Sequence, residues 1–89
     1  MLDPKPADSY STRGLLYIDT ENYSLAVADF NKAIEINPKS AEYYFYRALA
    51  YSYNNQDDLA IIDLNKVMNI STDPDLVKDA SQILAELKK

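Results

Sequence analysis

The charged side chains that recur at a fixed spacing are the first candidates for chemistry. Arg13 and Arg47 are 34 residues apart, and so are Asp29 and Asp63. Two neighbouring arginines could bind an anion, because each guanidinium presents several N–H donors. An isolated buried charge is costly, however, so recurrence of both signs at one period favours pairing of each arginine with an aspartate on a neighbouring segment. An internal ladder of ion pairs is the favoured interpretation, and an anion site is the alternative.

The densest carboxylates lie in two short runs that could, by their chemistry, attract a metal ion. One run is Asp57–Asp58, and the other contains Asp73, Asp75 and Asp79. A calcium loop also needs a central glycine and a closing glutamate, and neither accompanies these runs. Aspartate is favoured at helix starts by capping and by the helix dipole. We therefore interpret both runs as helix starts and expect no metal site.

The chain has no cysteine and no histidine, which removes several kinds of chemistry. Disulfides, thiolate nucleophiles, the usual structural zinc sites and imidazole acid–base catalysis are all excluded. A catalytic pair would have to come from Asp, Glu, Lys, Ser and Tyr alone, and none stands at an evident cleft. We expect neither enzymatic activity nor a cofactor.

The composition indicates one small helical domain. The chain has 89 residues, of which 47% are hydrophobic and 26% are charged, as is typical of a folded chain of one domain. Gly14 is its one glycine, whereas small sheet proteins need many glycines in tight turns. The net charge of −5 argues against nucleic acid as a partner, because phosphates attract lysine and arginine.

Nothing in the sequence indicates a membrane segment. No apolar run approaches the roughly 20 residues that cross a bilayer, and residues 1–4 lack the basic and apolar regions of a signal peptide. We expect no membrane partner. The compartment stays open, with a slight preference for the cytoplasm.

The chain contains an internal repeat with a period of 34 residues. Segments 7–40 and 41–74 share eleven identical residues in one register. Within each repeat, apolar residues at three- and four-residue spacing predict two amphipathic helices. In the second helix of the first repeat this stripe consists of Leu25, Ala26, Phe30, Ala33 and Ile36, and Leu59 repeats Leu25.

Regular breaks separate the predicted helices. Asn22 and the Asn54–Asn55 pair fall between helices, where asparagine tolerates turns. Ser40 is a predicted N-cap, and Asp73 is another, with Pro74 in the first turn of the last helix. The predicted helices span residues 7–20, 23–36, 41–54, 57–70 and 75–87.

These repeats resemble the tetratricopeptide repeat family. That family's pattern has an aromatic residue, a small residue four positions on and a tyrosine three further, followed by small residues on the second helix and a closing proline. The matching residues are Tyr10, Gly14, Tyr17, Ala26, Phe30, Ala33 and Pro38 in the first repeat, and Tyr44, Ala48, Tyr51, Ala60, Leu64 and Val67 in the second. The second repeat departs from the pattern at Thr72, where proline is expected.

The resemblance implies an all-α fold, an antiparallel helix-pair solenoid of five helices. Residues 1–89 then form one domain, with a tail at 1–6, repeats at 7–40 and 41–74, and a capping helix at 75–89. Such arrays need a cap, because each pair cannot bury its apolar face alone. The last helix offers an inward stripe for this purpose, composed of Leu76, Ala80, Ile83, Leu84 and Leu87.

The resemblance also implies a function, because family members bind extended or helical peptides in a concave groove lined by the first helix of each repeat. Carried over by position, that wall contains Asp8 and the candidate partner-binding residues Ser11, Leu15, Ile18, Glu42, Phe45, Leu49 and Ser52. Lys78 of the last helix, Tyr46 and Tyr53 complete the candidate set. A matching ligand would carry apolar anchors and some positive charge.

An unusual concentration of aromatic rings marks the first helix of the second repeat. Tyr43, Phe45, Tyr46 and Tyr53 do not fall on the family's packing positions, and an amphipathic helix cannot bury every face. These rings either contact a partner or pack on the capping helix and the helix ends. The leading hypothesis is a module that binds a partner protein. The alternatives are a structural unit that self-associates, or a fragment of a longer array.

Overall fold

The computed structural model describes residues 6–89 and contains five α-helices joined by short turns. The helices are α1 (Pro6–Asp19), α2 (Tyr23–Ile36), α3 (Ala41–Tyr53), α4 (Asp57–Ile70) and α5 (Pro74–Leu87). Each predicted helix is present, with its ends within one residue of the prediction, and no strand occurs in residues 6–89. The predicted all-α class is therefore confirmed. Most of the predicted tail, and the segment examined for a signal peptide, lie outside the described residues.

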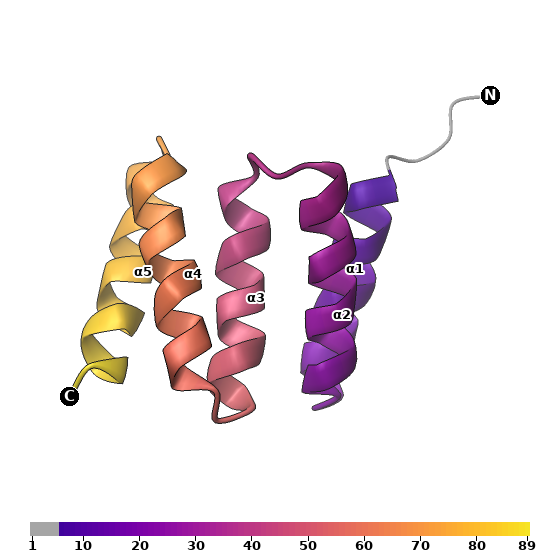
Figure 1. Ribbon diagram of the computed structural model, residues 1–89, viewed down its shortest axis with the longest axis horizontal. Coiled ribbons are helices and arrows are strands. Elements are labelled where there is room, and N and C mark those ends of the chain that lie inside the picture. The colour runs from indigo at the N-terminus through magenta and orange to yellow at the C-terminus, as the bar shows by residue number, and fades with distance from the viewer. Residues whose placement is uncertain (1–5) are drawn as a thin grey trace.

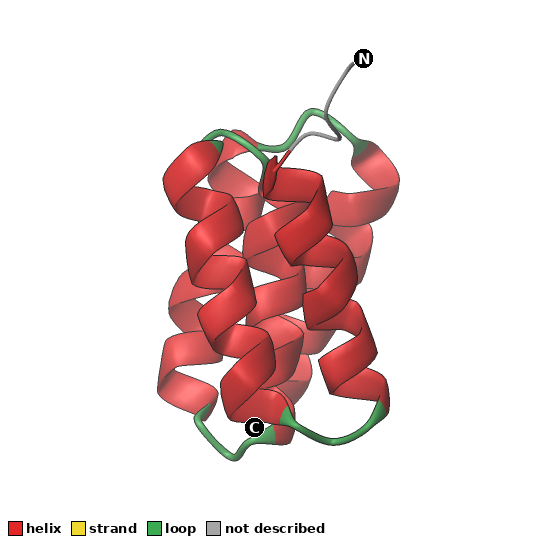
Figure 2. Cartoon of the chain, turned by 90° about the vertical axis from the view of Figure 1, so that its right-hand side faces the viewer, coloured by secondary structure: helices red, strands yellow, loops and turns green. Residues whose placement is uncertain are grey.

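The helices stand side by side in chain order, so that α1 and α5 lie at opposite ends of the molecule (Figure 1). Each helix packs mainly against the helix before it and the helix after it, and the longest extent is 48 Å. Seen from the α1 end, the turns lie at the top and the bottom of the molecule, where the helices end (Figure 2). Short turns between adjacent helices make consecutive helices antiparallel, so α1, α3 and α5 run in the same direction.

The breaks between helices agree with the sequence, but two of them are built differently from the prediction. Asp73 caps α5 as predicted, because its Oδ1 accepts a hydrogen bond of 3.0 Å from the amide of Asp75. Ser40 stands at the N-cap of α3 as predicted, but its side chain makes no capping hydrogen bond. Its hydroxyl turns to Glu42 instead. In the first turn, Glu21 takes the left-handed conformation rather than Asn22.

Small residues let the helix axes approach closely, as the repeat pattern predicts. Gly14 of α1 lies against Phe30, which is fully buried, and a methyl group added at Gly14 would come within 2.7 Å of the phenyl Cζ. In the second repeat the corresponding pair is Ala48 and Leu64, both buried in one cluster with α5. The second repeat therefore has alanine in place of glycine on its first helix and, opposite it, leucine in place of phenylalanine.

The apolar stripe of the second helices is narrower than predicted. Ala26, Phe30 and Ala33 are buried, but Leu25 and Ile36 are about half exposed. Leu59 is also exposed, so its predicted place in the stripe was wrong. Asp29 and Asp63 are four residues after Leu25 and Leu59 and are buried, so the aspartates are part of the inward face and the leucines lie at its edge.

The capping helix α5 contributes the stripe predicted for it. Ala80 and Leu84 are buried, and the other three apolar members pack against the same cluster, namely Leu76, Ile83 and Leu87. Lys78 is exposed on its outer side. The apolar end of the second repeat is therefore covered within the chain.

Candidate functional site

The recurring charges form two equivalent ion pairs, as the ladder interpretation predicted. Arg47 of α3 donates from Nε and Nη2 to the two carboxylate oxygens of Asp63, each at 2.8 Å. Its guanidinium lies between the rings of Tyr44 and Tyr51, 5.5 and 5.7 Å from their centroids. The hydrogen bonds to Asp63 raise the pKa of Arg47. A two-point pair of this kind fixes the orientation of α3 on α4.

The first repeat contains the same arrangement. Arg13 of α1 donates from Nε and Nη2 to Asp29 at 2.7 and 2.8 Å. Tyr10 and Tyr17 flank its guanidinium at 5.8 and 5.9 Å. Because both arginines bind carboxylates of the chain itself, their charge is neutralised internally. The geometry supports the ladder and not the anion site.

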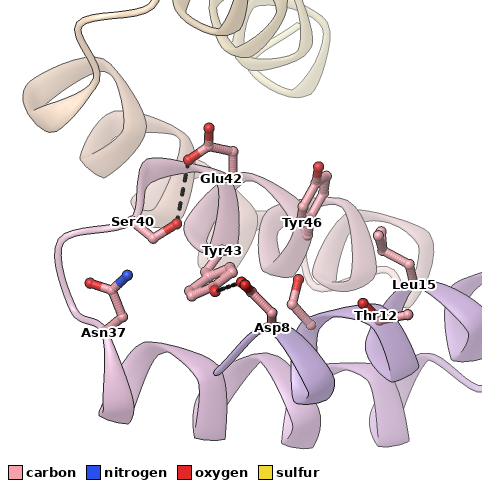
Figure 3. Close-up of a pocket in the computed structure, with 9 residues that line it drawn as sticks. Asp8, Thr12, Leu15, Asn37, Ser40, Glu42, Tyr43 and Tyr46 are labelled. Atoms are coloured by element: carbon pink, nitrogen blue, oxygen red, sulfur yellow. Dashed lines mark hydrogen bonds between the residues drawn. The ribbon is translucent and has the colours of Figure 1, made fainter. Parts of the chain in front are cut away.

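A cavity of about 590 Å³ opens between α1 and α3, next to the turn that joins α2 to α3 (Figure 3). We call it the α1–α3 cavity. Its lining combines acidic, hydroxyl, amide and apolar groups from both repeats. The lining residues are Asp8, Ser11, Thr12, Leu15, Asn37, Ser40, Glu42, Tyr43 and Tyr46.

One hydrogen bond ties the two repeats together at this cavity. The hydroxyl of Tyr43 donates to Oδ1 of Asp8 at 2.5 Å (Figure 3). Tyr43 is buried, and burial together with this hydrogen bond raises the pKa of Tyr43 to about 12. The phenol therefore stays protonated at neutral pH and serves as a donor. Glu42, on the other side of the cavity, accepts a longer bond of 3.4 Å from Ser40.

Four of the predicted partner-binding residues line the α1–α3 cavity. Leu15 and Glu42 are exposed, Tyr46 is partly buried, and Ser11 is buried in its floor. They come from both first helices, as the repeat register requires. The structure thus brings together the part of the predicted wall nearest the start of α1 and α3.

The other predicted residues lie outside this cavity. Ile18 packs partly against the cluster around Phe30, and Phe45 packs partly against the cluster that α3, α4 and α5 share. Tyr53 is exposed, and its ring contacts Tyr23 at 5.6 Å between centroids. The remaining candidates are Leu49 and Ser52, which are partly exposed on α3, and Lys78, which is exposed on α5.

The sequence interpretation missed several lining residues. Thr12, Asn37 and Ser40 were not proposed for the wall, and Tyr43 was placed among the unassigned rings. The 34-residue repeat could have indicated two of them, Tyr43 and Thr12. Residues 34 positions apart lie side by side on α1 and α3, so Tyr43 and Tyr46 had to approach the face of α1 that bears Asp8 and Thr12.

The described residues contain neither a group of metal ligands nor a membrane-spanning helix. Within residues 6–89, no group of three or more acidic side chains is arranged to hold a metal ion. The helices in this range are also too short and too polar to cross a membrane.

Comparison with known protein families identifies the type of repeat. One tetratricopeptide repeat profile matches residues 7–40, and a second matches residues 30–62. Together the two matches cover α1, α2, α3 and the first part of α4. The chain belongs to the tetratricopeptide repeat family. A comparison with curated proteins finds no match.

Membership of the tetratricopeptide repeat family gives the general class of activity. Tetratricopeptide repeats generally mediate protein–protein interactions, and domains of this kind typically bind other proteins. The family is typically a non-enzymatic scaffold. The second match starts inside α2 and ends inside α4, so it spans the boundary between the two repeats.

Proposed function

We propose that this chain binds a peptide or helix of a partner protein along α1 and α3, with the α1–α3 cavity as the anchoring point. The observation that carries the proposal is that this cavity is lined by both repeats. Its walls come from the first helix of each repeat, and its end comes from the turn between the repeats. A ligand held there would contact two repeats at once.

The lining suggests the chemistry of the ligand. Asp8 and Glu42 provide carboxylates on opposite sides of the cavity, whereas Leu15 and the ring of Tyr46 provide apolar surface. A lysine or arginine side chain would pair with the carboxylates, and its aliphatic stem would lie along the apolar surface. The net charge of −5 would speed the arrival of a basic ligand, more so at low ionic strength.

The proposal can be tested with peptides selected from a random displayed library on the folded domain. The affinity of a selected peptide is then measured by fluorescence anisotropy for the wild type, Glu42→Gln and Glu35→Gln. Both variants remove one negative charge from an exposed residue, but Glu35 lies on α2 outside the cavity. We expect Glu42→Gln to weaken binding by about 1 kcal/mol and Glu35→Gln to have a much smaller effect.

Equal effects of the two variants would show that only the net charge matters and that the cavity does not anchor the ligand. Selection of acidic peptides would also contradict the proposal. Phe45→Ala is less suitable as a test, because Phe45 packs against the core and its loss would change stability.

Self-association is a second candidate function, supported by apolar residues on the surface. Leu16, Leu25 and Ile62, on α1, α2 and α4, are each at least half exposed, and a second copy of the chain could cover such side chains. Sedimentation equilibrium over a range of concentrations, without any peptide, separates this function from peptide binding. A mass that rises from monomer to dimer would favour self-association.

A further inference from the structure

The outward side of α1, at the first end of the stack, carries a second surface that shares only Asp8 and Thr12 with the α1–α3 cavity. Ser9, Thr12, Arg13 and Leu16 lie there and, with Asp8, line a shallow depression of about 430 Å³. We call these four residues the α1 outer face. Leu16 is 59% exposed. A helix packed against this side chain, beside Arg13, would remove its apolar surface from water, and this burial would stabilise the contact.

The second repeat shows what the equivalent face does when it has a neighbour. Residues 34 positions further on are Tyr43, Tyr46, Arg47 and Ala50. All four contact the first repeat: Tyr43 packs with Ala7 and Ala33, Tyr46 and Ala50 pack with Phe30, and Arg47 bonds to Asn31. The face that is open on α1 is therefore, on α3, the interface between repeats.

The arginines show the same difference at the level of single atoms. Nη1 of Arg47 donates to Oδ1 of Asn31 on α2 at 2.8 Å. Within residues 6–89, Nη1 of Arg13 has no such acceptor, although its Nε and Nη2 bind Asp29 in the same way. The first repeat thus presents an oriented N–H group where the second repeat binds an amide.

We propose that the α1 outer face binds a helix of a partner protein, in the position that α2 occupies against α3. The helix would run antiparallel to α1 and place an asparagine or glutamine opposite Arg13. Ser9 and Thr12 are smaller than Tyr43 and Tyr46, so large apolar side chains fit opposite them. Leu16 stands where α3 has the smaller, buried Ala50, so the partner helix needs a small residue opposite Leu16.

A second copy of this chain cannot supply such a helix from its folded state. Asn65 of α4 is the counterpart of Asn31, and it lies beside Ala60 and Val67, so α4 carries the required pattern. However, α5 covers this apolar surface, with Ala80 and Leu84 buried against it. The matching surface of α2 is covered by α3. We therefore assign the helix to another protein and not to a second copy. Arg13 and Leu16, which carry the inference, lie outside the α1–α3 cavity.

The test uses a synthetic peptide as the probe. The peptide has the sequence of residues 22–37 with Ala33→Leu, is stabilised as a helix by a side-chain crosslink, and carries a fluorescent label. It keeps Ala26 for the position opposite Leu16 and Asn31 for Arg13. We expect binding at peptide concentrations below about 1 mM, as for a single helix on a small apolar surface.

Two protein variants locate the binding site. Leu16→Lys should weaken binding about tenfold, because it removes the apolar contact. Ile62→Lys is the matched control, since Ile62 is 63% exposed on α4 and gains the same charge; it should bind as the wild type does. Glu42→Gln should also leave this binding unchanged, which separates it from binding in the cavity. Unchanged affinity of Leu16→Lys, or no binding at about 1 mM, would overturn the proposal.

Two further measurements sharpen the test. A peptide that also carries Asn31→Leu should bind severalfold more weakly, because the hydrogen bond to Arg13 is lost; equal affinity would contradict the assigned role of Arg13. Sedimentation of the chain alone gives the remaining outcome. A dimer that Leu16→Lys abolishes would assign the α1 outer face to a second copy and overturn the partner helix.

Discussion

The two arginine–aspartate pairs have the same spacing and the same two-point geometry, but their surroundings differ. The side chain of Arg47 is 19% exposed and that of Arg13 is 57% exposed, whereas Asp63 and Asp29 are both nearly buried. Arg47 lies between two repeats and Arg13 lies at the end of the stack. We therefore expect the same motif to contribute more stability between the repeats than at the end of the stack.

The largest expected effect comes from removing the ion pair between Arg47 and Asp63. Arg47→Ala should lower the free energy of unfolding by about 3 kcal/mol, because it leaves the buried carboxylate of Asp63 without a partner. Arg13→Ala should cost less, since water can reach the vacated place beside Asp29. Urea denaturation followed by circular dichroism measures both. Equal losses for the two variants would show that the exposure of the arginine does not control the energy of the pair.

A second difference between the repeats concerns the small residue of the first helix. Gly14→Ala should destabilise the chain by about 1 kcal/mol, because overpacking against fully buried Phe30 outweighs the gain in helix propensity. Adding Phe30→Leu reproduces the pairing of Ala48 with Leu64 found in the second repeat.

Thermal denaturation of the single and double variants tests this comparison. The double variant should be more stable than the sum of the two single changes predicts, since the added methyl group fills space that the phenyl ring leaves. Additive effects would mean that position 14 and the ring at position 30 do not compete for the same space.

The last comparison distinguishes the two equivalent asparagines. Asn31→Ala should cost about 1 kcal/mol, because it removes the hydrogen bond from Arg47. Asn65→Ala is its matched control at the same helix position; in residues 6–89 no arginine bonds to its side chain, so the change should stay within about 0.5 kcal/mol. A similar loss in both variants would assign the effect to the helix and not to the inter-repeat bond.

Most of the fold could be predicted from the sequence because the repeat fixes its own register. The 34-residue period located four helices, and the inward stripe from Leu76 to Leu87 located the fifth. The ion pairs followed from two charges of opposite sign with the same period. The apolar periodicity did not predict the exposure of Leu25 and Ile36, because it considers apolar residues alone and so leaves out Asp29, which is part of the inward face.

The candidate site could be predicted only in part. Ser11, Leu15 and Glu42 follow from their positions in the family pattern, and they line one cavity. The depth of that cavity depends on how far α1 and α3 stand apart. Tyr43 and Tyr46 set this distance by packing between the repeats, and such a packing distance is not encoded by residue spacing. Whether the predicted set binds a partner stays a prediction.

The order of the helices in space has a consequence for how the molecule opens. Every substantial contact joins helices that are adjacent or nearly adjacent in the chain, so few long loops must close during folding and the rate should be high. It also means that an end helix can detach while the rest stays folded, since within residues 6–89 it packs on its neighbours from one side only. Amide protons of α3 and α4 should therefore exchange with solvent last, and the ends of the stack should exchange first.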